Sequence, residues 1–185
     1  WEDFDRDLTW EQLGERVIVE RPREVIPDWA SVVTCAIDWQ KSHYVWLVDG
    51  FGDSWRNATV AYGDTTSLDD ILFNVLLKTW RYEDGVERRI DFTLTDSGHK
   101  APDVYKWCKT CIQSHKIQNW PCKGSSGALK SEFVVTTLGK NTSMPGMQLF
   151  LVDTIQTQTW LDECLHRKQL SDRGAFELHD GSLDE

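Results

Sequence analysis

Apolar residues in this chain recur with two different periods, and the change from one to the other predicts a mixed α/β domain. Three runs rich in β-branched and aromatic side chains come first, at residues 32–38, 43–48 and 54–62. Such runs are typical of strands, and because only short turns separate them we expect an antiparallel meander. Residues 1–30, which precede the meander, are charged and interrupted by proline, with a short helix expected at 9–15.

Helices and strands alternate after the meander. Apolar residues recur with helical spacing at residues 67–82, 102–114 and 154–167. Each of these segments begins at or directly after a residue that favours the start of a helix. Strand-like runs are found at residues 90–95, 117–121, 132–138 and 147–152. This order predicts a mixed sheet with an antiparallel edge and flanking helices. It resembles the ribonuclease H-like architecture, with residues 31–170 as the domain and the polar residues 171–185 as a truncated tail.

Three of the strand-like runs end on an aspartate, at Asp38, Asp96 and Asp153. An ionised carboxylate beside an apolar core loses hydration, so three such residues at wide separation suggest strand ends that converge on a positive charge. The simplest candidate is Mg²⁺ or Mn²⁺, because both take hard oxygen ligands. We therefore expect a site for phosphodiester chemistry with two ions. In it Asp38 bridges both ions, Asp96 binds one, and Asp153 completes the cage or accepts hydrogen bonds beside it.

Each candidate residue has an alternative role that the sequence leaves open. Asp38 is also consistent with a turn at a strand end, Asp96 with a turn or helix cap, and Asp153 with capping the helix that follows it. Lys123 precedes a glycine-serine loop, where it either contacts the scissile phosphate or is a solvated lysine. His99 is a candidate ligand or proton shuttle, or else a surface histidine.

The charge of the chain weighs against strong DNA binding by this segment alone. Its formal net charge is −10, whereas nucleic-acid enzymes normally carry a basic surface. Bound metal ions neutralise part of the negative charge of a carboxylate site, and a parent chain can supply further basic surface. The net charge therefore lowers the expected affinity for DNA without excluding a nuclease.

The remaining composition points to a reduced, water-exposed setting. Five cysteines, an odd number with even scatter, indicate free thiols in a cytosolic environment, and the single CxxC lacks partners at zinc spacing. No run of about 18 apolar residues is present, so we expect no membrane span. The chain starts without methionine or a basic-then-apolar leader, which favours an excised fragment over a secretory protein.

Four short strings, in order along the chain, resemble the nuclease domain of the large terminase subunit of tailed bacteriophages, in its lambda-like branch. The strings are AIDWQ at 36–40, TDSGH at 95–99, PCKG at 121–124 and VDT at 152–154. Their order and spacing agree with that family from about residue 29 to residue 167. The resemblance implies a Mg²⁺- or Mn²⁺-dependent endodeoxyribonuclease that cuts concatemeric viral DNA during genome packaging.

The same resemblance implies the surroundings of the domain. Residues 1–30 resemble the linker from a preceding ATPase domain of the same parent chain. The other expected partners are double-stranded DNA, the small terminase subunit and the portal protein, in the host cytoplasm. No GxxxxGK[ST] loop is present, so we expect no ATP binding by this segment. The resemblance also implies a further acidic ligand in a helix beyond Glu185.

Two alternative functions remain open from the sequence. One is a non-catalytic module that docks DNA or the portal protein in the packaging motor, which the acidic net charge favours. The other is a resolvase or integrase-type enzyme of the same fold, which would show strand transfer or a preference for DNA junctions.

Overall fold

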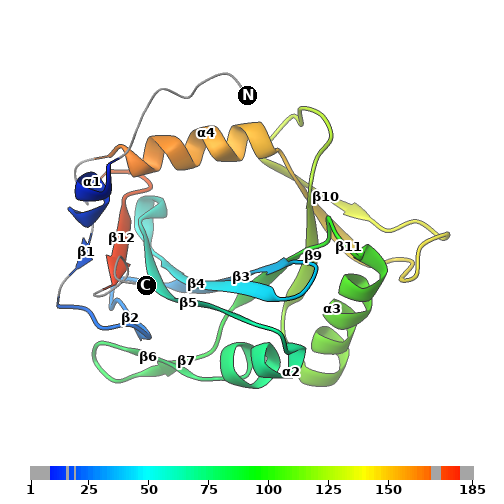
Figure 1. Ribbon diagram of the computed structural model, residues 1–185, viewed down its shortest axis with the longest axis horizontal. Coiled ribbons are helices and arrows are strands. Elements are labelled where there is room, and N and C mark those ends of the chain that lie inside the picture. The colour runs from blue at the N-terminus through cyan, green and yellow to red at the C-terminus, as the bar shows by residue number, and fades with distance from the viewer. Residues whose placement is uncertain (1–8, 16, 19, 168–171, 180–185) are drawn as a thin grey trace.

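The computed structural model of the protein describes residues 9–15, 17–18, 20–167 and 172–179. Within this part, nine strands form one mixed sheet in the order β1-β12-β5-β4-β3-β8-β9-β11-β10, and three more form a small sheet in the order β2-β6-β7 (Figure 1). Helices flank the large sheet. This architecture agrees with the ribonuclease H-like α/β fold predicted from the order of elements.

The elements have the following bounds. The large sheet contains β1 (Val17–Ile18), β3 (Val32–Trp39), β4 (Tyr44–Phe51), β5 (Asn57–Thr65), β8 (Phe92–Asp96), β9 (Asn119–Gly124), β10 (Phe133–Thr137), β11 (Gln148–Val152) and β12 (Phe176–His179). The small sheet contains β2 (Val25–Ile26), β6 (Trp80–Tyr82) and β7 (Glu87–Arg88). The helices are α1 (Trp10–Gly14), α2 (Leu68–Ile71), α3 (Ala101–His115) and α4 (Thr154–Leu165), with the 3₁₀ turn η1 (Asp53–Trp55) and the π turn η2 (Leu72–Leu76). No helix in the described part is long and apolar enough to cross a membrane.

Strands β3, β4 and β5 form the antiparallel meander that the sequence predicts. A four-residue turn, residues 40–43, joins β3 to β4, and within it the Gln40 N–H donates to the His43 carbonyl at 3.0 Å. Side chains alternate along β3, so Val33, Cys35 and Ile37 are buried in the core while the residues between them point to the other face. Asp38 belongs to that second set.

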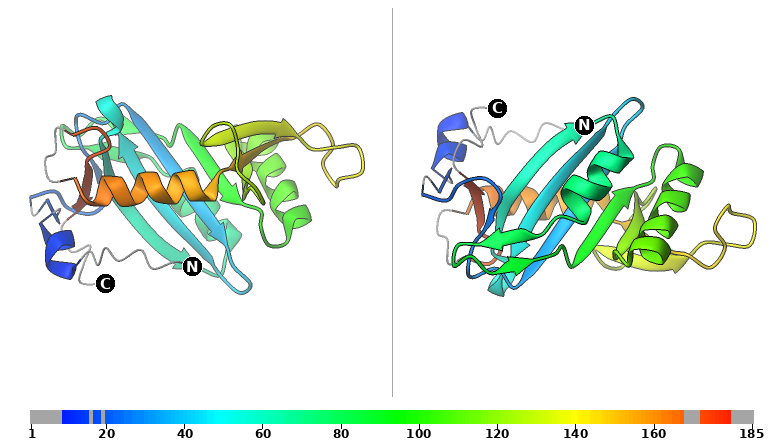
Figure 2. Two further views of the ribbon diagram at one scale, coloured as in Figure 1. Left: turned by 90° about the horizontal axis from the view of Figure 1, so that it is seen from above. Right: turned by 90° about the horizontal axis from the view of Figure 1, so that it is seen from below.

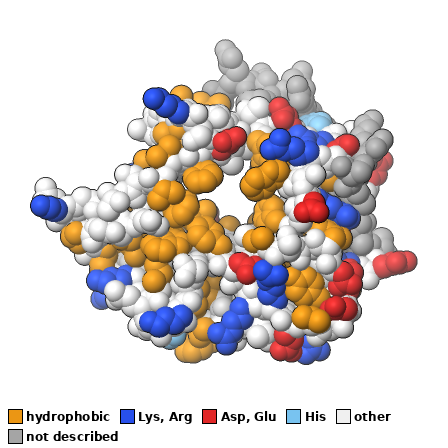
Figure 3. All heavy atoms as spheres, turned by 180° about the vertical axis from the view of Figure 1, so that it is seen from behind, with side chains coloured by type: hydrophobic (Ala, Val, Ile, Leu, Met, Phe, Trp, Pro, Cys, Tyr) orange, Lys and Arg blue, Asp and Glu red, His pale blue; other side chains and the backbone are white. Residues whose placement is uncertain are grey.

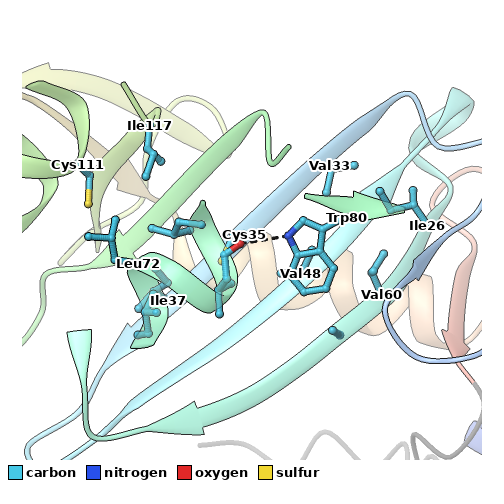
Figure 4. Packing of buried hydrophobic residues seen from close by; sticks show 14 of the residues in the cluster. Ile26, Val33, Cys35, Ile37, Val48, Val60, Leu72, Trp80, Cys111 and Ile117 are labelled. Carbon is cyan, nitrogen blue, oxygen red and sulfur yellow. Dashed lines mark hydrogen bonds between the residues drawn. The ribbon is translucent and has the colours of Figure 1, made fainter. Parts of the chain in front are cut away.

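Apolar side chains fill the space between the meander and the segment that follows it. Trp80 is 1% exposed, and its indole N–H donates to the Val75 carbonyl at 3.1 Å. Figure 4 shows the Trp80 ring beside Val48, within the cluster that also contains Val33 and Val60. The small sheet thereby closes one side of the core.

The helix predicted over residues 67–82 is wrong in length. Ser67 caps α2 as expected, by accepting from the Asp70 N–H at 3.3 Å, but the helix passes into η2 and ends near Leu77. Residues 80–82 form β6, which pairs in parallel with β2. Burial of Trp80 and this pairing override the helical spacing of the apolar residues, because tertiary contacts outweigh local propensity.

Strands β8, β9 and β11 extend the sheet beyond β3, and each runs parallel to its neighbour. Their carboxyl ends and that of β3 therefore lie along one edge of the sheet. Helix α3 covers one face of this half and buries Val104 and Cys108 against it. A proline in the first turn of α3 and a left-handed Lys116 at its C-cap set its ends, close to the predicted bounds.

Helix α4 lies over the opposite face of the sheet and leaves a hollow beneath it. Cys164 is the buried residue of this helix, whereas Ile155 and Leu161 are exposed. A cavity of about 530 Å³ opens on the sheet below, lined mostly by apolar residues of β3, β8 and the segment around η1. Figure 2 shows α4 crossing over the strands, and Figure 3 shows the opening rimmed by hydrophobic side chains. The face that carries Asp38 is therefore open to solvent.

Strand β12 was not predicted from the sequence, which indicated a polar tail there. Residues 176–179 pair in parallel with β5 on one side and with β1 on the other. Glu177 anchors this strand, because its buried carboxylate accepts from Arg56 Nε at 2.8 Å and lies 3.5 Å from Arg21 Nη1. A four-residue strand is too short for a periodic signal, and the predicted boundaries near residues 30 and 170 stay predictions.

Replacing Glu177 with glutamine should destabilise the fold. The Arg21 and Glu177 side chains are only 2% and 3% exposed, so the variant leaves a buried guanidinium without its counter-charge. Loss of one partner of a buried pair costs about 3–5 kcal/mol in the free energy of unfolding. Urea denaturation measures this loss. Glu87→Gln is the control, because the Arg81–Glu87 pair is exposed and worth at most about 1 kcal/mol. Equal losses in the two variants would show that the buried pair does not hold β12.

Asp49 on β4 should make stability depend on pH. Burial raises the pKa of its carboxyl to about 7, opposed by a hydrogen bond with the Thr59 side chain. Between about pH 4, where the unfolded carboxyl ionises, and pH 7, the folded carboxyl keeps its proton, so stability falls as the pH rises. Asp49→Asn should therefore gain about 2–4 kcal/mol relative to the parent on going from pH 4 to pH 8. Urea denaturation at both pH values tests this, and a difference that does not vary with pH would contradict it.

Candidate active site

The parallel pairing of β3 with β8 brings Asp38 and Asp96 side by side. Ile37 and Thr95 are partners across the two strands, and the next residue on each strand is the aspartate. Both Ile37 and Thr95 are buried on the core side, so both carboxylates point to the open face. Neighbouring strands lie about 4.8 Å apart, which places the two carboxylates within reach of a single ion. Asp38 is exposed and Asp96 is partly exposed.

Each carboxylate is held by a donor on one of its two oxygens. Gln40 lies two residues after Asp38, on the same face, and its side-chain amide donates to Asp38 Oδ2. The Gly98 N–H donates to Asp96 Oδ1 at 3.1 Å. Among the described residues no hydrogen bond reaches Asp38 Oδ1 or Asp96 Oδ2. The arrangement therefore orients one oxygen of each group and leaves the other available to a cation.

Cys122 is the third residue in this row and was not among the candidates from the sequence. It is the partner of Asp96 on β9 and is partly exposed. Burial raises the pKa of its thiol to about 12, with further contributions from the charges of Asp96 and Asp38. The charges of both carboxylates therefore act on the same thiol, so Asp38, Asp96 and Cys122 lie close together on this face of the sheet. The sequence carried no local signal for this placement, because it follows from the register of β9 against β8.

Asp153 lies apart from this pair. It follows β11, which is separated from β8 by β9, and it lies three residues beyond Phe150, the residue level with Cys122 and Asp96, so its backbone is roughly 14 Å from that of Asp96. Its Oδ1 accepts from the Gln156 N–H at 3.0 Å, and its Oδ2 accepts from the Leu129 N–H at 2.8 Å. These hydrogen bonds lower the pKa of the carboxyl, the one from Gln156 most. The contacts are those of a helix cap that also holds the preceding loop, and its role as a metal ligand stays a prediction.

Lys123 and His99 lie at the same edge of the sheet but outside the row of carboxylates. Lys123 follows Cys122 on β9, so its side chain starts from the opposite face of the strand, and it is exposed. His99 is exposed in the turn between β8 and α3. The catalytic role of Lys123 and the ligand role of His99 stay predictions.

The two carboxylates suit a divalent ion that takes the rest of its ligands from water and substrate. Mg²⁺ is usually bound by one or two carboxylates together with water and phosphate oxygens. Within the described residues, no group of three or more His, Cys, Asp or Glu side chains is arranged to hold a metal ion. Asp38 and Asp96 thus fit one shared ion, and a second ion needs ligands from substrate, solvent or another segment.

A comparison with protein-family models shows the family to which the chain belongs. The family model for the endonuclease domain of the terminase large subunit gpA matches residues 1–185. The chain belongs to this terminase endonuclease family. Neither a search of curated proteins nor a search of solved structures gave a significant match. The terminase domain therefore carries its paired aspartates at the edge where a nuclease site was predicted.

Replacing Gly98 with alanine should weaken divalent-ion binding by the terminase domain. An added Cβ at residue 98 would lie 3.2 Å from Asp96 Oδ2 and 3.4 Å from Oδ1, so the carboxylate must move. We expect Mn²⁺ affinity to fall about tenfold, the lower end of the effect of disturbing groups that orient metal ligands. Electron paramagnetic resonance of free Mn²⁺ measures the affinity. Gly127→Ala is the control, because nothing lies within 4 Å of a Cβ there. Unchanged affinity in Gly98→Ala would mean that Asp96 does not hold the ion.

Proposed function

We propose that this domain is a Mg²⁺- or Mn²⁺-dependent endodeoxyribonuclease that cuts concatemeric DNA during viral genome packaging. The observation that carries the proposal is the pair Asp38 and Asp96, which adjacent parallel strands present on one open face. Membership of the terminase endonuclease family supports the reaction class. A carboxylate pair at the carboxyl edge of a sheet is rigidly held, as hydrolysis at a metal ion requires.

We assign the following roles to the residues of the site. Asp38 and Asp96 hold the divalent ions, two in the full reaction, and Gln40 and the Gly98 N–H keep the two carboxylates turned toward them. When bound, the ions supply an activated water and neutralise the phosphate oxygens. Asp153 fixes the loop before β10 through the Leu129 N–H and supports the site from that side. Lys123 contacts a DNA phosphate at the same edge.

Lysines around the carboxylates suit a phosphate substrate. Lys41 follows β3, Lys100 follows β8 and Lys123 lies at the end of β9, and all three are exposed. Each belongs to a strand end or turn at the edge where Asp38 and Asp96 lie. The local surroundings of the carboxylates are thus less acidic than the net charge of the chain implies, and positive charge near the site favours approach of DNA.

The packaging motor supplies the other partners of this domain. Its family places it in a terminase large subunit. We propose that it acts beside an ATPase domain of the same parent chain, with the small terminase subunit and the portal protein, in the host cytoplasm. We further propose that an acidic residue from another segment, seated near the open face, adds to the ligands of the second ion.

Asp38→Asn and Asp96→Asn should each abolish metal-dependent cleavage. Loss of a ligand should lower the rate of plasmid nicking in Mn²⁺ by more than about 100-fold and remove the heat of Mn²⁺ binding in calorimetry. Stability should be unchanged or higher, because one of two neighbouring carboxylates is neutralised. Asp64→Asn is the control, since Asp64 is exposed on β5, two strands away from Asp38.

Parental cleavage in the Asp38 variant would show that the site is assigned wrongly. If the parent protein neither binds Mn²⁺ nor nicks DNA, the non-catalytic docking role gains support. Strand transfer or a preference for DNA junctions would favour a recombinase of the same fold.

A further inference from the structure

Positive charge is concentrated in one part of this acidic chain. Residues 97–152 contain seven lysines and two acidic residues, a formal charge of +5, although the whole chain carries −10. All of these residues are described, and they form α3, β9, β10 and β11 with their loops. In Figure 3, Lys and Arg predominate on the side of the molecule that carries these elements, whereas Asp and Glu gather on the opposite side. The negative net charge of the whole chain thus conceals this basic segment.

Three lysines of this segment lie on α3 or at its C-terminal end. Lys106, Lys109 and Gln113 are spaced by three or four residues and share one exposed face of the helix, and Lys116 follows at the left-handed C-cap, where its ammonium donates to the Gln113 carbonyl at 3.0 Å. From Lys106 to the last helical residue, His115, the helix axis rises roughly 14 Å. We call these three residues the α3 lysine stripe. No ion pair recorded among the described residues involves any of them.

The surface beside the stripe is hollowed. A cavity of about 330 Å³ lies between Lys109 and Gln113 on α3 and the loop around Pro145, with Trp120 among its lining residues. The other charged residue of that loop region is Lys140, which is exposed. The stripe therefore borders a shallow depression whose charged groups are positive.

The helix that carries the stripe starts beside the edge of the sheet where the carboxylate pair lies, on the opposite face of the sheet from Asp38 and Asp96. Helix α3 begins at Ala101, five residues after Asp96, and Lys100 lies in the turn between them. From there the helix runs back along the flank of the sheet, away from the edge that carries Asp38 and Asp96. A polyanion bound across this edge can continue along the flank of the sheet and stay in contact with positively charged side chains.

We propose that the α3 lysine stripe is an accessory surface that binds the phosphate backbone of duplex DNA flanking the cleavage site. The inference rests on the proposed function only in taking DNA as the substrate. Lysine ammonium groups bind phosphates as point charges, without reading sequence, so the stripe adds affinity and orientation and not specificity. It also accounts for DNA binding by a chain whose net charge is negative.

The composition of the stripe favours DNA over an acidic protein partner. Protein interfaces depend on buried aromatic or aliphatic anchors, with lysine depleted from their centres. The large hydrophobic side chains that the structure leaves exposed lie on other elements, such as β10 and α4, and none lies on α3. A helix face of lysines and glutamine, without an apolar anchor, suits a phosphate backbone.

The test replaces Lys106, Lys109 and Lys116 together with glutamine, which keeps the length of the side chains and the helix propensity. Binding of a short fluorescent duplex is followed by anisotropy in EDTA, so that no metal and no cleavage contribute. We expect binding at 50 mM salt to weaken at least about tenfold, and the slope of log K against log salt concentration to fall by about 2–3. The control variant neutralises three exposed arginines outside residues 97–152, namely Arg81, Arg89 and Arg173. It changes the net charge of the protein by the same amount as the stripe variant.

The outcomes separate this inference from the proposed function. If stripe and control variants lose affinity equally, net charge alone acts and the stripe is not a binding surface. If the stripe variant binds the duplex like the parent, the inference is overturned, and Mn²⁺-dependent nicking of plasmid still reports on the nuclease. If the parent shows no salt-dependent duplex binding, the inference also fails, and the stripe is then free to face an acidic protein. Thermal unfolding confirms that both variants are folded.

Discussion

The parallel pairing of β3 with β8 is the constraint on which the site depends. Ile37 and Thr95 face the core from neighbouring positions, and strand alternation then forces the residues after them onto the opposite face. A slip of one residue in this register would bury one carboxylate and leave the other alone. The apolar core of the domain therefore fixes the geometry of the two charges, although neither charge touches it. Binding energy is not needed to bring the aspartates together.

The same sheet tolerates charge only where a specific contact or an open face accommodates it. Glu177 is buried but lies against two guanidinium groups, whereas Asp49 has a buried oxygen without a hydrogen-bond partner in the described part. Asp38 and Asp96 avoid this cost because α4 stands away from their face and leaves it hydrated. An open face is necessary for a site that must admit a metal ion and a phosphodiester. The exposed apolar side chains around the hollow are the consequence of that opening.

The sequence predicted the parts of the fold that have strong periodicity. The meander, α3, α4 and the strand ends at Asp38 and Asp96 follow from alternation, caps and β-branched runs. The early end of α2 and the four-residue strand β12 could not be predicted, because each depends on a tertiary contact. Trp80 is drawn into the core in the first case, and Glu177 meets arginines distant in sequence in the second. Neither contact leaves a local pattern.

Prediction of the candidate site from the sequence is limited in the same way, because strand pairing decides which residues become neighbours. Strand alternation alone would have placed Gln40 beside Asp38, because two residues along a strand restore the same face. The register of β9 against β8 placed Cys122 beside Asp96, which no string of residues reveals. For Asp153 the sequence allowed either a cap or a ligand, and its hydrogen bonds to Leu129 and Gln156 occupy both oxygens. A carboxylate used in this way stabilises the loop and the helix start more directly than it can share a cation roughly 14 Å away.

The distribution of charge reconciles an acidic chain with a nucleic-acid substrate. A surface potential is local on the scale of the Debye length, about 8 Å at physiological salt, so distant acids of the β6–β7 hairpin, such as Glu83, Asp84 and Glu87, are largely screened at α3. In the proposed complex with DNA, the lysines of residues 97–152 therefore meet little opposing charge. The paired aspartates lie at the border of this region, and in the proposed nuclease a bound cation offsets their repulsion of phosphate. On this proposal the flank holds DNA, and the reacting phosphate approaches the carboxylates when the metal is in place.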